Sequence, residues 1–187
     1  VDLRVGKLRP ADPTMLLTKQ CDADFIDDPT CPLWIKFLHE IFQHDVETIR
    51  AVQILLGYTL IGEVLDEILI ICYGFGANGK SVLNNVIANV LGDYAQAAPP
   101  SMLRVRRSDD NGPRNDLAGI KGSRYLSFNE LQAGDRLDEQ VIKAIAGREV
   151  ISARFLFGEF FSFKPTFKGW VRTNHRPIIT GDDDGIW

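Results

Sequence analysis

The residues with the clearest chemical meaning form one glycine-rich segment, Gly74-Phe75-Gly76-Ala77-Asn78-Gly79-Lys80-Ser81. It fits the pattern G-x-x-x-x-G-K-S/T, in which glycines let successive backbone N–H groups surround an anion and the following helix adds its positive N-terminal end. In this pattern Lys80 reaches the β- and γ-phosphates and the Ser81 hydroxyl ligates Mg²⁺. The segment predicts ATP binding, against the alternative of a turn with an exposed lysine. The expected nucleotide contacts are Gly74, Gly76, Ala77, Asn78, Gly79, Lys80, Ser81 and, further along, Asn129.

Two later polar residues follow apolar strand-like runs and could complete a hydrolytic site. Glu130 ends the run 124–129, and its carboxylate is predicted to activate the attacking water. Asn129 and Glu130 are expected to contact Mg²⁺ through water, beside the direct ligand Ser81. Asn174 ends the run 167–173, where its amide could bond the γ-phosphate and the water together. The predicted catalytic set is Lys80, Glu130 and Asn174; the alternatives are a solvated carboxylate and a turn asparagine before Pro177.

These side chains need an α/β framework to bring them together. The apolar run 68–73 predicts a parallel strand covered on both faces, and the stripe from Leu83 to Leu91 predicts the helix after it, closed by Gly92. Further strands are expected at 94–98, 124–129, 150–157, 160–163 and 167–173, with a helix over 137–146. Upstream, residues 1–30 read as a linker, and 31–66 as a helical subdomain whose second helix stops at Gly57. The ATPase domain then spans 67–187.

Composition excludes several other classes of protein. The 187 residues are 45% hydrophobic and 25% charged, as in a globular domain, and the longest apolar run is too short to span a membrane. Three cysteines without a Cys-x-x-Cys pair indicate neither a zinc site nor a disulfide framework, which favours the cytoplasm. The net charge of -4 argues against coating of nucleic acid by bulk charge. Basic residues exceed acidic ones only after residue 100, so any polyanion contact is expected there.

The ordered motifs resemble the superfamily 3 helicase domain of phage and plasmid primase-helicases, related to poxvirus primase-helicases. The resemblance rests on the following short segments: Val1 to Arg4, Leu8 to Pro10, Cys31 to Trp34, Leu56 to Tyr58, Asn78 to Ser81, Arg124 to Glu130, Lys143 to Gly147, Ala153 to Leu156, Phe163 to Pro165, Thr173-Asn174 and Gly185 to Trp187. It implies an AAA+-like P-loop NTPase with a parallel sheet and helices on both faces. By position Gly79 to Ser81 form Walker A, Glu130 closes Walker B and Asn174 is sensor 1.

The resemblance also implies how such a motor would hold DNA. The segment from Lys143 to Phe163 matches a motif whose hairpin projects into the central channel of a hexameric ring. Candidate DNA contacts are Arg154, Lys164, Lys168 and Arg148, with Phe157 and Phe160 for base stacking, although aromatics here could equally form hairpin core. The cluster Arg104, Arg106 and Arg107 could face DNA, a neighbouring subunit or solvent. Lys143 is a candidate for reaching a neighbour's γ-phosphate.

Three departures from the family pattern qualify the expected activity. Asn129 replaces the first Walker B acid, the predicted hairpin tip at 157–160 has no cation, and the arginine finger is expected beyond Trp187 with the strand that follows it. The expected function is an ATP-dependent helicase that moves single-stranded DNA through a homohexamer in phage or plasmid replication, in the host cytoplasm. An upstream primase-like domain is expected in the same polypeptide, and the isolated 187 residues are expected to be weakly active or inactive. The alternatives are a nucleotide-binding oligomerisation module without unwinding activity, and a small-molecule kinase.

Overall fold

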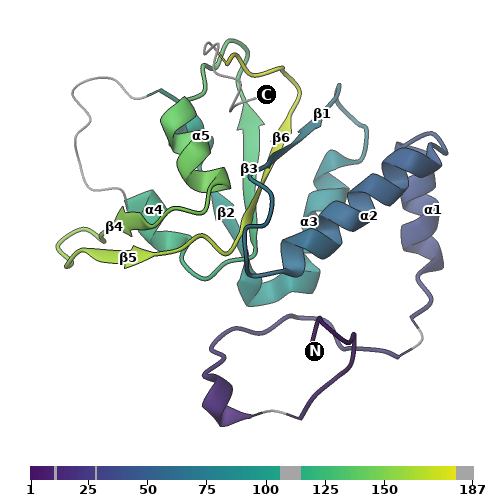
Figure 1. Cartoon of the computed structure of the whole chain (residues 1–187). Helices are drawn as coiled ribbons and strands as arrows, with labels where there is room; N and C mark the ends of the chain where they lie inside the picture. The colour runs from purple at the N-terminus through teal and green to yellow at the C-terminus, as the bar shows by residue number, and fades with distance from the viewer. Residues whose placement is uncertain (11, 28, 106–114, 180–187) are drawn as a thin grey trace.

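The centre of the fold is a parallel sheet of four strands in the order β1-β6-β3-β2 (Figure 1). The computed structural model describes residues 1–10, 12–27, 29–105 and 115–179. The strands are β1 (Leu69–Tyr73), β2 (Ala95–Ala98), β3 (Tyr125–Leu131) and β6 (Lys168–Thr173). All their carboxyl ends therefore lie at one edge of the sheet, as the sequence predicted for the polar residues that follow them.

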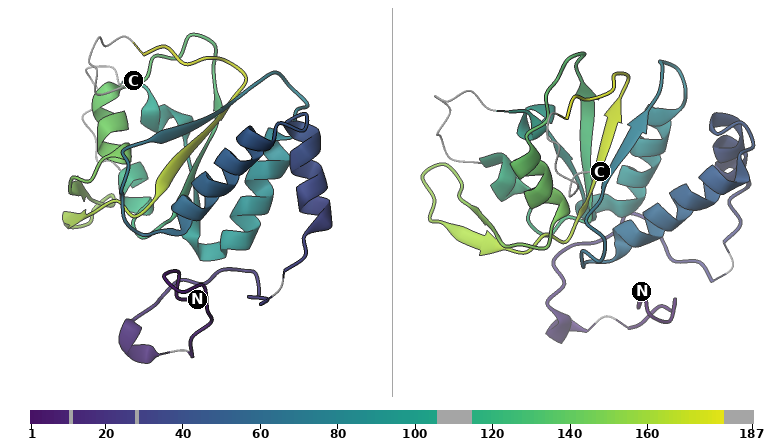
Figure 2. Two further views of the ribbon diagram at one scale, coloured as in Figure 1. Left: turned by 45° about the vertical axis from the view of Figure 1, so that its right-hand side comes forward. Right: turned by 45° about the horizontal axis from the view of Figure 1, so that its top comes forward.

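Helices cover both faces of this sheet, as Figure 2 shows from two directions. One face carries α1 (Pro32–Ile41), α2 (Val46–Leu60) and α3 (Lys80–Leu91), and the other carries α4 (Asn115–Gly119) and α5 (Glu139–Ala146). Alternation along β3 divides the core between the faces. Tyr125 packs with Trp170 and the α1–α3 side chains, whereas Leu126 and Phe128 pack with α5. The expected mixed α/β fold with helices on both faces is confirmed.

Two helices begin at capping aspartates. Asp45 accepts hydrogen bonds from the backbone N–H groups of Glu47 and Thr48 at the start of α2, and Asp138 does the same for α5. The expected stop of α2 at Gly57 is wrong, because the helix continues to Leu60. Its last turn is held by Thr59, whose hydroxyl donates to the Leu55 carbonyl and accepts from Trp170 Nε1 at 3.0 Å.

Strand β1 differs from its prediction in position. It lies at the edge of the sheet, and the side chains of Ile71 and Tyr73 remain 38% and 42% exposed. The reason is that α5 packs against β6 rather than over β1. An apolar run of this length therefore marks a strand of a parallel sheet but does not require cover on both faces.

The remaining elements lie at the periphery. Strands β4 (Ile151–Ala153) and β5 (Phe161–Phe163) form an antiparallel hairpin that projects from the body beside α4 (Figure 1), and β4 ends well before the expected residue 157. Short 3-10 turns lie at η1 (Pro13–Met15), η2 (Gly92–Tyr94) and η3 (Pro100–Leu103). Residues 19–22 dock on the end of α3, where Lys19 Nζ donates to the Asp93 carbonyl. None of the described helices is long and apolar enough to cross a membrane.

Candidate functional site

The glycine-rich loop, residues 74–79, joins the end of β1 to the start of α3 at Lys80. Its geometry requires glycine at position 79, where φ is +81°. A Cβ atom there would clash with Ile41 Cγ2 and would lie 3.2 Å from Phe37 Cε2, so α1 packs directly against the loop. Ala77 also has a positive φ of 60°. The tight loop ahead of a helix is the local structure that the motif predicted.

Lys80 folds back over this loop. Its Nζ donates to the carbonyl oxygens of Gly74 at 2.6 Å and Phe75 at 3.0 Å, and to Asn78 Oδ1 at 2.8 Å. Partial burial lowers the pKa of Lys80 from its ordinary value, and the positive charge of Arg172 lowers it further. In this structure the three donors of the ammonium are therefore taken up by oxygens of the loop itself.

A cavity of about 360 Å³ opens beside the loop and brings the three predicted catalytic residues together. It is lined by part of the loop and the first turn of α3, by the C-terminal parts of β3 and β6, and by the residue that follows β6: Gly76 to Val82, Glu130, Arg172, Thr173 and Asn174. Lys80, Glu130 and Asn174 thus share one cavity, as expected from strand ends that meet at one edge of a sheet. Two predicted contacts do not line it. These are Gly74, whose carbonyl is bonded by the Lys80 ammonium, and Asn129, which precedes Glu130 in β3.

Glu130 reaches the cavity through an irregularity in β3. The register between β3 and β6 shifts between Asn129 and Leu131, and Glu130 itself has a φ of +62°. A positive φ is costly for a residue with a side chain, and such bulges redirect side chains at functional sites. The bulge leaves the carboxylate exposed at the cavity. The neighbouring Asn129 Oδ1 is buried and has no hydrogen-bond partner among the residues that the structure describes.

Arg172 is a cavity residue that no sequence motif indicated. It lies on β6, where its register partners are Cys72 on β1 and Asn129 on β3. Alternation places it on the same face as Trp170, which is the face covered by α3. The only sequence signal was a basic residue two positions before Asn174 in a predicted strand, which is too common to single out.

The structure gives Lys168 a structural role instead of the expected DNA contact. Its side chain is only 3% exposed, and Nζ donates to the carbonyls of Ile61 at 2.5 Å and Glu63 at 2.8 Å. The ammonium also lies 4.2 Å from the ring centroid of Tyr58. Burial lowers its pKa to about 8. Lys168 therefore ties the α2–β1 connection to β6 and is not available to a phosphate backbone.

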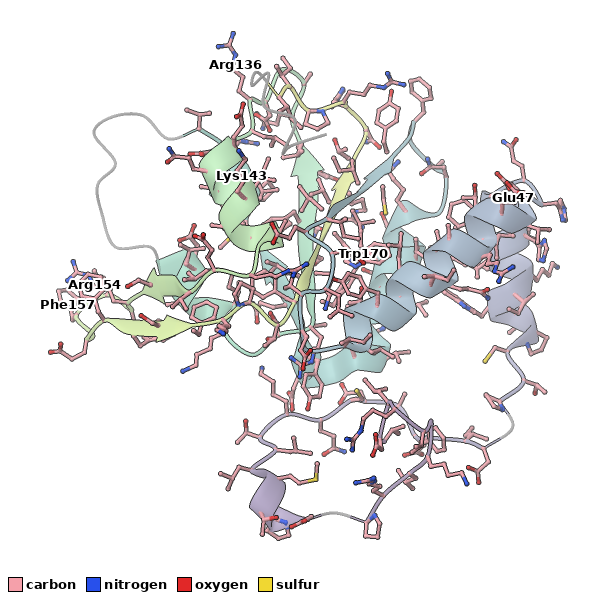
Figure 3. The ribbon with its side chains drawn as sticks, in the orientation of Figure 1. Glu47, Arg136, Lys143, Arg154, Phe157 and Trp170 are labelled. Carbon is pink, nitrogen blue, oxygen red and sulfur yellow. The ribbon has the colours of Figure 1, made fainter. Side chains whose placement is uncertain are left out.

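The other basic candidates are on the surface but in different places. Arg148 forms an ion pair with Glu67 at 3.4 Å and donates to the Leu65 carbonyl. Figure 3 shows Lys143 on α5 and Arg154 out on the hairpin. Lys164 is exposed just after β5. Arg104 forms an ion pair with Asp135 at 2.8 Å, whereas Arg106, Arg107 and residues 185–187 lie outside the described residues.

The hairpin aromatics divide into a core group and an exposed group. Phe163 is buried near the base, whereas Phe157 at the tip is 99% exposed and Phe160 is 69% exposed. The Arg154 guanidinium lies 4.7 Å from the Phe160 ring centroid. Figure 3 shows Arg154 and Phe157 together at the end that points away from the body. The tip is thus an exposed aromatic surface with one adjacent cation, and only the base of the hairpin is core.

Comparisons with known proteins agree with this architecture. The fold and cavity define a parallel α/β protein with a glycine-rich loop at the carboxyl edge of its sheet. A family model described as "D5 N terminal like" matches residues 1–43. Over its whole length the chain is 33% identical to "Putative helicase L207/L206" of Acanthamoeba polyphaga mimivirus, of which it covers 20%. Over 82% of its length it is 27% identical to "Putative primase C962R" of African swine fever virus (isolate Warthog), of which it covers 16%.

A solved structure, the apo form of the NrS-1 C-terminal region, shares the fold with a TM-score of 0.61 at 13% sequence identity. The match covers 84% of this chain and 37% of that one. The sequence matches, to viral proteins named as helicase and primase, support a primase-helicase family for the chain and agree with the resemblance seen in the motifs, whereas the structure match shows a likeness of fold alone. Both viral relatives are much longer proteins, and the chain spans a fifth of their length or less.

Proposed function

We propose that this chain is the ATP-hydrolysing motor part of a DNA primase-helicase involved in replication. The observation that carries the proposal is the convergence of Lys80, Glu130 and Asn174 on one cavity beside the glycine-rich loop. The viral relatives named as helicase or primase agree with it. Residues 67–187 would be the ATPase domain of AAA+-like P-loop type, 31–66 a helical subdomain that packs on its loop, and 1–30 a linker.

The residues of the cavity suit hydrolysis of a nucleoside triphosphate. Backbone N–H groups of the loop and the Lys80 ammonium would bind the β- and γ-phosphates. The Glu130 carboxylate would take a proton from the attacking water. As it does so, the oxygen of this water would bond the γ-phosphorus, and the bond between the γ-phosphorus and the oxygen that leaves with ADP would break. The Asn174 amide would donate to the γ-phosphate and accept from the same water, because a carboxamide offers both functions.

Magnesium fits the polar groups beside the loop. The Ser81 hydroxyl lines the cavity and would bind the ion directly, with Glu130 and Asn129 acting through water. The buried Oδ1 of Asn129 has no hydrogen-bond partner among the described residues, and its two lone pairs would allow it to accept from a metal-bound water and from one further donor. When bound, the ion would neutralise charge on the β- and γ-phosphate oxygens.

The hairpin would be the DNA-contacting element of this motor. Phe157 and Phe160 offer exposed rings for base stacking, and Arg154 offers a neighbouring cation for the phosphate backbone. Exposed Lys164, and Arg148 nearer the body, would add charge. In this proposal the motor works as a homohexameric ring around single-stranded DNA, with a primase-like domain elsewhere in the polypeptide and Lys143 directed at the neighbouring subunit.

The test measures ATP binding and phosphate release in the whole protein that contains this chain. Lys80→Ala is expected to abolish hydrolysis, and Glu130→Gln to keep ATP binding while turnover falls by about 10²–10⁴-fold, the usual contribution of a general base. Glu139→Gln, at an acid on α5 that does not line the cavity, is the matched control and should hydrolyse ATP normally. Hydrolysis that does not respond to single-stranded DNA would contradict the motor function.

A second candidate is a nucleotide-binding oligomerisation module without its own turnover. The presence of a neutral amide at Asn129, where the family often has an acid, favours it. ATP turnover by the wild-type protein with Asn129 intact excludes this candidate. ATP-dependent assembly without phosphate release would support it instead.

A further inference from the structure

Arg172 shares a cavity with Lys80 although it belongs to neither the glycine-rich loop nor α3. It lies in a row with Cys72 and Asn129 across three adjacent strands, on the sheet face beneath α3. The same side chain also lines a second, very small cavity between α3 and the sheet, together with Lys80, Asn84 and Tyr125. Arg172 therefore forms part of the cavity floor, between the strand that ends at the loop and the strand that carries Glu130.

The immediate neighbours leave this positive charge unbalanced. Cys72 is a thiol and Asn129 is an amide, so neither register partner carries a negative charge. Within the described part of the chain, the guanidinium makes no ion pair or hydrogen bond, and Glu130 lines the same cavity without coming within 4.0 Å of it. Two cations that face one cavity without a carboxylate between them repel each other, and an anion bound between them relieves that repulsion.

The row also contains an acceptor that could orient the guanidinium. Asn129 is the register partner of Arg172 on β3, and its buried Oδ1 has no hydrogen-bond partner in the described part of the chain. A guanidinium carries five N–H donors in a rigid planar fork, enough to bond this oxygen and a phosphate at once. Arg172 also lies on β6, the strand that Asn174 directly follows, so both residues reach the cavity from the end of the same strand.

We propose that Arg172 is a second phosphate-binding cation, supplied by the same subunit, which contacts the terminal phosphate of a nucleoside triphosphate while Asn129 orients its guanidinium. This inference rests on the proposed nucleotide-binding function and adds a specificity to it. The glycine-rich loop and Lys80 would bind diphosphate and triphosphate alike. Arg172 would distinguish them, because only the triphosphate places a charged group next to the ends of β3 and β6.

The test is calorimetric titration of the 187-residue chain with MgADP and with the Mg²⁺ complex of β,γ-imido-ATP. Arg172→Gln is expected to weaken binding of the triphosphate analogue by about 10- to 100-fold, the usual effect of losing a charge-assisted hydrogen bond, and to change ADP binding less than about twofold. Arg172→Lys keeps the charge but loses the planar fork of donors, so its affinity for the triphosphate analogue is expected to lie between those of the wild type and Arg172→Gln. Arg50→Gln, at an exposed arginine on α2, is the control and should match wild type.

The outcomes separate this inference from the proposed function. If the wild-type chain binds neither nucleotide, the proposed nucleotide site is wrong and the inference falls with it. If it binds both, and Arg172→Gln weakens both equally or neither, the nucleotide site stands and the inference is wrong. Should the variant not fold, wild-type protein treated with phenylglyoxal gives the answer by mass spectrometry. Protection of Arg172 by the triphosphate analogue but not by ADP supports the inference, and equal protection overturns it.

Discussion

Lys168 and Arg172 show how the same residue class acquires different roles on one strand. Both are basic, both lie on β6, and their spacing of four places them on the same face of the sheet. Lys168 meets the carbonyls of Ile61 and Glu63, whereas Arg172 meets an open cavity. The difference lies in the acceptors that the neighbouring segment supplies, which the strand's own sequence does not contain.

The buried ammonium of Lys168 gives the unfolding free energy a characteristic pH dependence. Its pKa is lowered to about 8 in the folded state from an ordinary value of 10.5. Between these two pKa values the unfolded chain binds more protons than the folded chain, so the unfolding free energy of the wild type should rise with pH relative to that of Lys168→Met. Below about pH 8 the unfolding free energies of the two proteins should change with pH in parallel. Urea unfolding of both proteins from pH 7 to pH 10 measures the difference. Parallel curves across that whole range would show that the folded ammonium does not lose its proton there.

At the scale of elements, a contact from another strand determines where α2 ends. Thr59 lies in the last turn of α2, and its hydroxyl accepts a hydrogen bond from Trp170 Nε1 on β6 while it donates to the Leu55 carbonyl. Tertiary structure thus extends the helix beyond Gly57, although the local sequence favours an earlier stop.

Thr59→Val should therefore destabilise the fold, although the two side chains have nearly the same shape. The substitution leaves the indole N–H of Trp170 buried and unpaired, which costs about 1–3 kcal/mol. Urea unfolding measures the loss, and Thr30→Val, at an exposed threonine, is the control. A loss below about 0.5 kcal/mol, the range of ordinary surface substitutions, would mean that the hydrogen bond does not anchor α2.

The hairpin is an element whose tip contributes little to folding. Phe157 is 99% exposed, so Phe157→Ser should change the unfolding free energy by no more than about 0.5 kcal/mol. In the proposed motor, the same substitution should weaken single-stranded DNA binding by about 1–3 kcal/mol, the cost of losing one stacked base. Fluorescence anisotropy with a labelled oligonucleotide measures it. Leu33→Ser, at a similarly exposed apolar residue on α1, should leave DNA binding unchanged.

At the scale of the molecule, two hydrophobic clusters share the same strands. Ile145 of α5 packs on one face and Ile87 of α3 on the other, with β3 and β6 between them. Each of these strands contributes alternate side chains to both clusters. If the packing on one face unfolds, the strands are disrupted and the cluster on the other face unfolds with them.

Ile145→Ala and Ile87→Ala should therefore each lower the stability of the whole chain by about 2–5 kcal/mol in a single transition. Far-UV circular dichroism follows all the helices, and tryptophan fluorescence follows the three tryptophans of the chain, of which Trp34 and Trp170 belong to the cluster on the α3 face. The two signals should remain coincident in both variants. Separate transitions for Ile145→Ala would show that the two faces unfold independently.

Much of this molecule could be predicted from local pattern, because glycine spacing, apolar periodicity and capping aspartates act over a few residues. The meeting of Lys80, Glu130 and Asn174 could be predicted as well, since carboxyl ends of parallel strands share one edge. The order of strands could not be predicted, so the expectation that β1 is covered on both faces is wrong. The bulge at Glu130 and the place of Arg172 depend on register between strands distant in sequence, which no single segment encodes.

Because α1 packs on the glycine-rich loop, a movement of the loop is passed on to α1. Gly79 has Ile41 and Phe37 pressed against it, so a rearrangement of the loop must displace the C-terminal turn of α1. A helix of ten residues transmits such a displacement about 15 Å along its axis to its first turn. Cys31, the exposed thiol that precedes that turn, is thus a native attachment point from which a fluorophore would report loop movement without any engineered cysteine.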